Sequence, residues 1–105
     1  RSKNDTDCVL FIANWPEKRK DAWISLLKAR AIENQTFVLG VNRVGMDGNG
    51  FSHSGDSSIY DPIGKCLEHR SYEECIILHC LKKEALLKTR ENFQFYKDAD
   101  NFTLL

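Results

Sequence analysis

A short apolar run, residues 9–13, ends at Asn14 and Trp15, whose side chains suit the wall of a binding pocket. Open α/β sheets carry their binding and catalytic groups just outside the carboxyl ends of the strands. Trp15 would supply an apolar wall there, and Asn14 would present its main chain to a bound molecule. Composition alone favours the alternative, a packed corner with a core tryptophan. We therefore expect a site at this corner and keep both interpretations open.

Four cysteines are candidates for a nucleophile, metal ligands or disulfide partners. Cys8 is nearest to the corner, but it stands inside the predicted strand and not at its C-terminal end, and it has no histidine near it in sequence, so we do not assign it as a nucleophile. The cysteines and histidines lack the paired spacing of a zinc site. We predict no metal, no cofactor and four buried, reduced thiols, as in intracellular enzymes: Cys8, Cys66, Cys75 and Cys80.

The Met-Asp-Gly-Asn-Gly stretch at residues 46–50 matches neither of two familiar ligand-binding loops. A calcium loop would need an oxygen ligand where Phe51 stands and a Glu further on. A phosphate loop would need a following Lys-Ser or Lys-Thr pair and a helix. We predict a glycine-rich turn inside a loop that spans residues 42–54.

The elements around the corner follow from apolar spacing. Residues 9–13 and 37–41 are continuous apolar runs, as in strands covered on both faces. Pro16 marks a helix start, and the pattern stays helical to about Asn34. The inward face of this helix is predicted to carry Trp23, Leu26, Leu27 and Ala31. Strand, helix and strand with short joints form a βαβ unit, so the two strands should be parallel neighbours.

The second half of the chain carries weaker signals. Residues 57–60 and 65–69 are predicted to form a hairpin around the turn Asp-Pro-Ile-Gly at 61–64. Residues 74–81 are predicted to form another strand. A helix over residues 82–91 should turn Ala85 and Leu86 inward. Residues 93–105 carry four aromatic side chains, which must pack against something.

Composition limits the classes of function. The chain has 105 residues, enough for one small domain, with 42% hydrophobic and 29% charged residues. Its net charge of zero gives no electrostatic footprint for nucleic acid or an anionic membrane surface. The apolar runs are too short to span a bilayer. Three Asn-x-Thr sequons, at Asn4, Asn34 and Asn101, are interpreted as chance.

Taken together, the motifs resemble the nitrilase superfamily of carbon–nitrogen hydrolases, and within it the ω-amidase-like branch. The resemblance covers essentially the whole chain. It rests on the stretches 13–16, Ala-Asn-Trp-Pro; 29–35, Ala-Arg-Ala-Ile-Glu-Asn-Gln; 41–45, Val-Asn-Arg-Val-Gly; 47–50, Asp-Gly-Asn-Gly; 55–57, Gly-Asp-Ser; 61–64, Asp-Pro-Ile-Gly; and 98–102, Asp-Ala-Asp-Asn-Phe. Asn92-Phe93-Gln94-Phe95 departs from the Phe-Pro that the family usually has there.

The resemblance implies an α/β fold, the C-terminal part of a four-layer α-β-β-α sandwich. It also implies an amidohydrolase that cleaves a carboxamide through a Cys thioester, with Glu and Lys assisting. All three catalytic residues are expected upstream of Arg1, so the chain would be an inactive C-terminal part of the enzyme. The alternative function is a catalytically inactive binding or assembly module of the same half-fold. A small Cys/His metal-binding domain is a weaker alternative.

The resemblance also assigns roles to residues. The substrate would be a small ω-amide of an oxo or dicarboxylic acid, whose free carboxylate needs a cation. Arg19 lies in the charged first helical turn and matches the family pattern, so it is expected to bind that carboxylate beside Asn14 and Trp15. Within the helix, Arg30 and Glu33 are spaced to form an ion pair. Together with Asn34, they are expected to serve as scaffold, and Glu33 is not the missing base.

The partners expected from the resemblance are few. We predict a small-molecule amide substrate, a homodimer formed through the packing tail at residues 93–105, and a cytoplasmic location. No nucleic acid and no membrane is expected as a partner.

Overall fold

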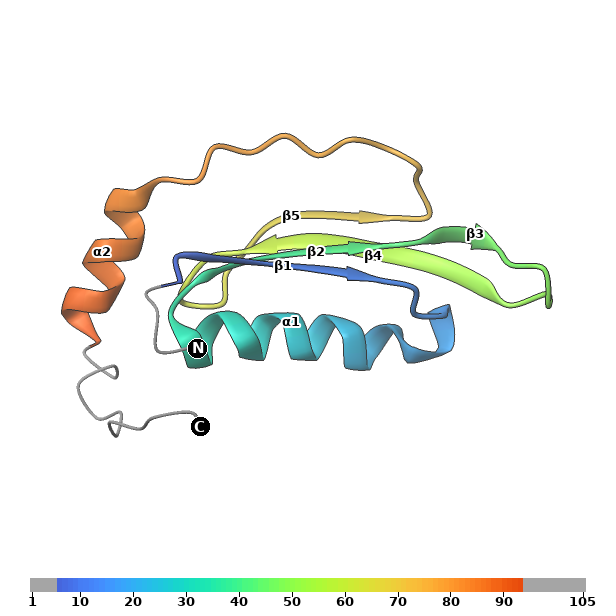
Figure 1. Ribbon diagram of the computed structural model, residues 1–105, viewed down its shortest axis with the longest axis horizontal. Helices are drawn as coiled ribbons and strands as arrows, with labels where there is room; N and C mark the ends of the chain where they lie inside the picture. Colours follow the sequence, from blue (N-terminus) through green and yellow to red (C-terminus); the bar gives the residue numbers. More distant parts are fainter. Residues whose placement is uncertain (1–5, 94–105) are drawn as a thin grey trace, which may run out of the picture.

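The computed structural model describes residues 6–93, which form one mixed sheet with a long helix on one face and an extended segment across the other (Figure 1). The sheet order is β1-β2-β4-β3, and β5 pairs with the other edge of β4. The elements are β1 (Cys8–Ala13), the 3-10 helix η1 (Glu17–Arg19), α1 (Lys20–Asn34), β2 (Phe37–Asn42), β3 (Val44–Met46), β4 (Ser52–Tyr60), β5 (Cys66–Ser71) and α2 (Lys83–Asn92).

The predicted βαβ unit is confirmed. β1 and β2 are parallel neighbours, in register from Cys8 opposite Phe37 to Ala13 opposite Asn42. Pro16 is extended, with φ −71° and ψ 159°, and starts the helical stretch. At the other end, Gln35 adopts the left-handed conformation with φ 48°. Its main-chain N–H donates to carbonyls in the last turn of α1. This turn sends the chain directly into β2.

The face of the sheet that α1 covers, called the near side below, holds the core. Trp23, Leu27 and Ala31 of α1 are buried against Val38 and Tyr60. A side chain at Gly40 would put a Cβ 2.5 Å from Leu27 Cδ1, so the helix packs directly on bare backbone there. Leu26, predicted to face inward, is 43% exposed. That part of the prediction is therefore wrong.

Residues 42–54 differ from the predicted loop, because most of them form a hairpin. β3 pairs antiparallel with the first part of β4, from Val44 opposite Ser54 to Met46 opposite Ser52. The turn between them is closed by Asp47, whose carboxylate accepts main-chain N–H bonds from Asn49 at 2.8 Å and Phe51 at 2.9 Å. Glycine and polar residues predict a loop here, and the cross-strand pairing that overrides them is not a local signal.

The predicted hairpin of β4 and β5 is confirmed. Its turn is closed by the Gly64 N–H donating to the Asp61 carbonyl at 2.9 Å. The β4–β5 register shifts between Gly55 and Ser57. This bulge leaves Asp56 with a positive φ of 54° and turns its side chain into a polar cluster.

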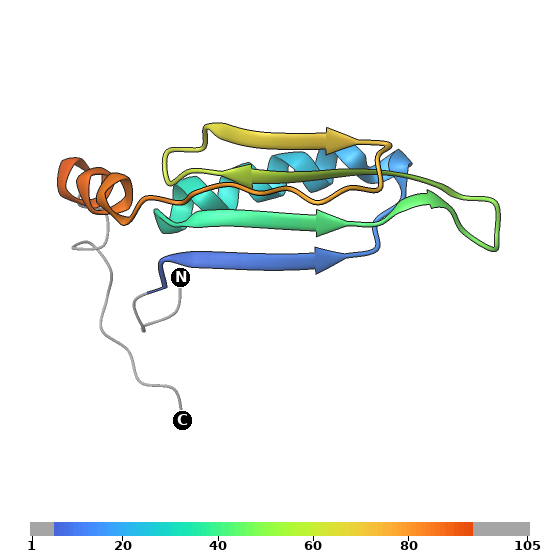
Figure 2. The same cartoon turned by 90° about the horizontal axis from the view of Figure 1, so that it is seen from above.

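The opposite face, called the far side below, is covered only in part. Residues 72–82, the crossing segment, run over it without regular secondary structure (Figures 1 and 2). The predicted strand at 74–81 is therefore wrong, because no described strand lies beside this segment to pair with it. Ile76 and Leu78 are each 87% exposed. A cavity of about 260 Å³ separates the segment from the sheet and is lined by Leu39, Val41, Ile59, Arg70, Cys75 and Ile77, among others.

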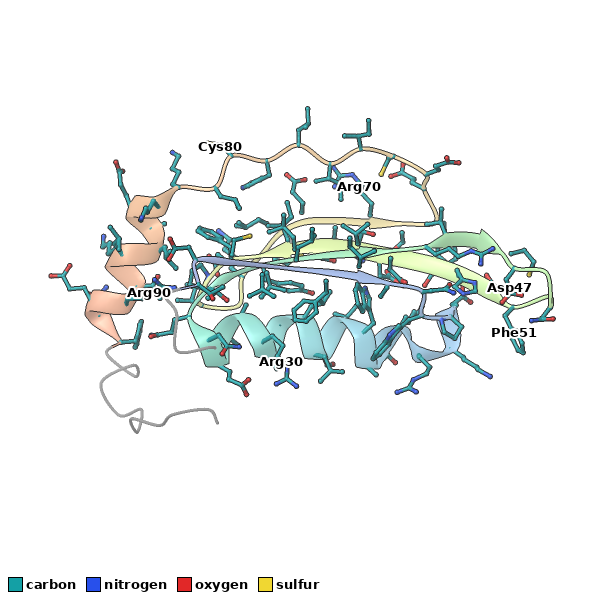
Figure 3. The ribbon with its side chains drawn as sticks, in the orientation of Figure 1. Arg30, Asp47, Phe51, Arg70, Cys80 and Arg90 are labelled. Carbon is teal, nitrogen blue, oxygen red and sulfur yellow. The ribbon has the colours of Figure 1, made fainter. Side chains whose placement is uncertain are left out.

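Helix α2 is held at the end of the sheet by Arg90, whose side chain is 13% exposed. Its guanidinium donates to the Asp7 carboxylate at 2.9 Å and to the carbonyls of Thr6 at 2.6 Å and Gln35 at 3.1 Å (Figure 3). The hydrogen bond to Arg90 holds the pKa of Asp7 below its ordinary value.

Leu86 of α2 is buried as predicted, whereas Ala85 is exposed, so that part of the prediction is wrong. Phe93 is the last described residue, and Gln35 donates a side-chain hydrogen bond to its carbonyl. Apart from Phe93, the predicted packing tail lies outside the described residues.

Candidate functional site

The corner after β1 is fixed by a side chain from β2. The β1–β2 ladder ends at the pair Ala13 and Asn42. Beyond it, the Trp15 N–H donates to Asn42 Oδ1 at 2.9 Å, and Asn42 Nδ2 donates to the Trp15 carbonyl at 3.1 Å. One amide side chain thus satisfies both main-chain groups of Trp15, as another strand residue would do. Asn14 is exposed beside this clamp.

The Trp15 ring packs on a second indole. The ring centroids of Trp15 and Trp23 lie 5.7 Å apart with an interplanar angle of 53°. Trp23 Nε1 donates to the buried Asp56 carbonyl at 2.9 Å, which anchors the pair to the bulge of β4. Trp23 is buried, as predicted for the inward face of the helix, while Trp15 remains partly exposed. A cavity of about 220 Å³ opens beside them, lined by Phe11, Trp15, Trp23, Leu26, Leu27 and Arg30.

Two cations of η1 lie over aromatic rings at the same end of the sheet. The Arg19 guanidinium carbon is 5.0 Å from the Trp15 ring centroid, and Lys18 Nζ is 4.9 Å from that of Phe51. Phe51 lies at the tip of the β3–β4 hairpin, which extends past the end of the sheet (Figure 3). Among residues 6–93, no carboxylate forms an ion pair with Arg19.

A buried carboxylate, Asp56, supports the corner from behind. It accepts hydrogen bonds from Ser54 Oγ at 2.6 Å, from His69 Nε2 at 2.8 Å and from Ser71 Oγ. Burial by itself would raise the pKa of Asp56, but these three donors outweigh it and hold the pKa below its ordinary value. Ser71 and Asp56 share the same histidine nitrogen, Nε2, so the group lacks the relay of a catalytic triad.

Sequence reasoning missed the roles of Asn42 and Asp56. Both stand in stretches that carry the family resemblance, which was the available signal. Asn42 contacts Trp15, 27 residues away in the chain, and Asp56 contacts Trp23, 33 residues away. No local sequence pattern reveals contacts over such distances.

The three residues expected to serve as scaffold lie together on α1. Arg30 Nη1 is 2.9 Å from Glu33 Oε1, with both side chains about half exposed. Asn34 Nδ2 donates to the Arg30 carbonyl at 2.9 Å. The predicted ion pair is therefore present, on the outer surface of the helix. Its role as scaffold for the site stays a prediction.

The cysteines do not contribute to the corner. All four are free and exposed, so the prediction that they are buried is wrong. Cys8 follows the strand alternation of Leu10 and Ile12 on the poorly covered far side. It is also the first residue of β1, at the other end of the strand from Trp15. Burial by its neighbours, followed by the charge of Asp7, raises the pKa of the Cys8 thiol, the opposite of what a nucleophile needs.

Residues 6–93 contain neither a cluster of metal ligands nor a helix suited to a membrane. No three His, Cys, Asp or Glu side chains gather there as metal ligands. None of the helices in the same range has the length and apolar character needed to cross a bilayer.

A sheet with a helix layer on one face and an apolar opposite face has the layers of one half of an α/β sandwich. The family model of carbon-nitrogen hydrolases matches residues 2–89, and the chain belongs to this family. A CN-hydrolase superfamily protein from Xanthomonas campestris, solved with an arsenic adduct in its active site, superposes with a TM-score of 0.89 at 42% identity. The match covers 94% of this chain and 37% of that one.

Other relatives agree with this assignment. The omega-amidase YafV of Escherichia coli is 44% identical over 105 residues, which are 99% of this chain and 41% of that protein. A 2-oxoglutaramate amidase of Bacillus subtilis is 41% identical over 86% of this chain and 35% of its own length. Yeast Nit3, of the nitrilase superfamily, shares the fold with a TM-score of 0.67 at 22% identity. The predicted family and fold are confirmed, and the chain spans about 41% of the length of the first relatives.

Proposed function

We propose that this chain is part of an ω-amidase, which hydrolyses the terminal carboxamide of a short oxo or dicarboxylic acid to the acid and ammonia. The observation that carries the reaction class is the 44% identity to an omega-amidase along 99% of this chain. The geometry of the corner agrees with it, because Trp15 and Arg19 offer an apolar wall and a cation side by side.

The proposed reaction needs a nucleophile outside this sequence. A Cys thiolate would attack the carboxamide carbon, and a Lys would stabilise the oxyanion that forms. A Glu would protonate the departing nitrogen to release ammonia, then take a proton from the water that opens the thioester. None of the four cysteines here stands at the corner, which supports placing this triad outside the 105 residues. By itself this chain would then be inactive.

The role of Arg19 is to select substrates that carry a carboxylate. Its side chain is exposed, its guanidinium carbon lies 5.0 Å from the ring centroid of Trp15, and no carboxylate within residues 6–93 forms an ion pair with it. A planar guanidinium held by an aromatic face keeps its N–H edge free for two parallel bonds to a carboxylate. We assign Trp15 and the main chain of Asn14 to the part of the pocket that holds the short carbon chain.

Replacing Arg19 in the whole enzyme tests this role. R19A should raise KM for an acidic ω-amide by about 10- to 100-fold, the usual loss for a charge-assisted hydrogen bond. KM for a neutral amide of the same length should change less than about threefold, because that substrate has no carboxylate to lose. Steady-state ammonia release from the two amides measures both values.

Lys18→Ala is the matched control, since it removes a neighbouring cation that lies over Phe51 rather than Trp15. It should leave both KM values close to wild type. An equal rise of KM for the acidic and neutral amides in R19A would contradict the carboxylate role. A wild-type enzyme that releases no ammonia from any ω-amide would instead refute the proposed function itself.

An inactive binding or assembly module remains the second proposal for the chain. It would have to expose Leu10, Ile12 and Val41 of the far side to solvent. Such an apolar sheet face invites aggregation, so the structure supports the enzyme part better than a self-standing module. The homodimer through residues 93–105 and the cytoplasmic location stay predictions.

A further inference from the structure

Asn42 makes an unusual number of contacts for a residue at a strand end. Besides its two bonds to the Trp15 main chain, Nδ2 donates to the Gly55 carbonyl at 2.9 Å. Its own N–H donates to Ser57 Oγ at 2.9 Å, and that hydroxyl donates back to the Asn42 carbonyl at 3.3 Å. The residue therefore links the pocket corner after β1 to the bulge of β4.

The hydrogen bonds at this position need an amide, because no other side chain of the same size offers one acceptor and two donors. Oδ1 accepts one N–H, while the two hydrogens of Nδ2 serve two carbonyls, those of Trp15 and Gly55. A carboxylate would keep the acceptor but would face two carbonyl oxygens without a proton to offer. An apolar side chain would leave all three main-chain groups without these bonds.

The bulge that Asn42 binds is itself rigid. Gly55 has φ 79°, and a Cβ there would lie 2.6 Å from Val44 Cγ1, so only glycine fits. The next residue, Asp56, is held by Ser54, His69 and Ser71 through its side chain. Its carbonyl accepts the indole N–H of Trp23. Both the main chain and the ring of Trp15 are thus tied to the same three residues, 55–57, by separate routes.

We propose that Asn42 is a positioning residue for the substrate pocket, which sets the place of Trp15, and with it of Arg19, by coupling the corner to the β4 bulge. The proposal deepens the proposed function and rests on it for its kinetic part. Asn42 acts through Trp15 and not by touching the substrate. Arg19 follows because its guanidinium lies on the Trp15 ring.

Asn42→Asp in the whole enzyme is the sharpest test, because it keeps shape and acceptor and removes both donors. KM for an acidic ω-amide should rise at least about tenfold with kcat within about threefold, since a displaced wall weakens binding more than chemistry. Hydrogen exchange should become faster in the peptide that holds Trp15 and stay unchanged in peptides of α1. A purely structural residue would loosen the whole sheet instead.

Thr89→Val is the matched control, since its Oγ1 also donates to a main-chain carbonyl, that of Ala85 in α2, at the other end of the sheet from the corner. It should change neither KM nor exchange at Trp15. If Asn42→Asp does not fold, Asn42→Ser replaces it, as a smaller side chain that avoids the buried charge and is expected to show the same pattern.

Two results would overturn the proposal: an unchanged KM with unchanged exchange at Trp15, or faster exchange spread evenly over the sheet. The exchange readout needs no substrate. It therefore tests the positioning role even if the wild-type enzyme cleaves no ω-amide, a result that would count against the proposed function alone.

Discussion

The two sides of the sheet differ in how completely this chain covers them. On the near side, α1 packs its apolar residues on β2 and β4, and the polar groups of the bulge are paired. On the far side, the crossing segment lies over a cavity and forms no ladder with the sheet, while Ile12 stands 78% exposed. The ties of the segment to β5 are polar, with His79 Nδ1 3.1 Å from Glu68 Oε2.

This difference shows which side of the sheet is packed by segments that follow one another in the sequence. The near side is built from a strand, a helix and a strand that follow one another, so its core closes within residues 8–60. The far side has the alternating apolar residues of a sheet that packs on a second layer. In the four-layer fold of the family, this is the face between the two sheets. The pocket corner lies at the carboxyl end of β1, at the margin between the near side and the far side.

The largest effect is expected from a side chain at Gly40, which would push α1 off the near side. G40V should lower the free energy of unfolding by about 3 kcal/mol, the upper range for overpacking a close contact. The clash is with Leu27 and Trp23, neither of which can move without opening the core. Urea unfolding of the whole enzyme followed by circular dichroism measures the loss.

Two variants sharpen the comparison. Gly48→Ala places a Cβ where nothing lies within 4 Å, so its stability should match wild type. V41A, the next residue after Gly40 but on the far side, removes a side chain that is 48% exposed in this chain, so its cost should be about 1 kcal/mol or less here and larger in the whole enzyme, where the second sheet of the family fold would cover it. A cost for V41A as large as that of G40V would mean that the far side is as fully buried in the whole enzyme as the near side.

An intermediate effect is expected at Asp56. D56N should cost about 2 kcal/mol at pH 7, because an amide cannot accept all three hydrogen bonds in a buried place. The folded-state pKa of Asp56 is depressed, so its stabilisation is complete above the unfolded pKa and is lost as the pH falls through the lower folded value. The difference between wild type and variant should therefore shrink below about pH 4.

Urea midpoints measured from pH 3 to pH 7 check this dependence. Asp47→Asn, at the exposed hairpin tip, also alters an acceptor of two main-chain bonds and should cost less. A wild-type advantage over D56N that grows on acidification would contradict the assignment.

The smallest effect is expected on the outer surface of α1. E33A breaks the exposed pair with Arg30 and should cost less than about 0.5 kcal/mol. Ammonia release should stay at the wild-type rate, because Glu33 is mostly exposed and is predicted to take no part in the chemistry. Activity lost without a loss of stability would show that Glu33 belongs to the site after all.

Sequence reasoning succeeded where the signal is local. The strand at 9–13, the helix ending at Asn34, the strand at 37–41 and the turn at 61–64 all follow from apolar runs, Pro16 or turn chemistry. It failed at residues 42–54 and 74–81, where pairing between distant segments decides whether a run becomes a strand. Serine and glycine form β4 because β3 and β5 flank them, whereas the Ile-rich stretch stays unpaired.

The site was predictable to a similar degree. Asn14, Trp15 and Arg19 were proposed from their place after a strand end and from family resemblance, and their role in substrate binding stays a prediction. The contacts of Asn42 and Trp23 with the corner were not predicted. The sequence does not show which carbonyl group an amide or an indole N–H will bind.

The Arg90 contacts also set an order for folding during synthesis. Arg90 joins Asp7 across 83 residues, and the Asn42 clamp reaches only 27 residues back. As the chain grows from its amino end, the near-side core is complete once β4 has been made, and the pocket corner has all its partners once β5 follows with His69 and Ser71. The start of β1 is joined to β2 by the Phe37 N–H, which donates to the Asp7 carbonyl at 3.0 Å, and it gains the Arg90 bonds to Thr6 and Asp7 only when α2 emerges. A ribosome that stalls before Arg90 would therefore present a finished corner on a sheet whose first strand lacks these last bonds at its start.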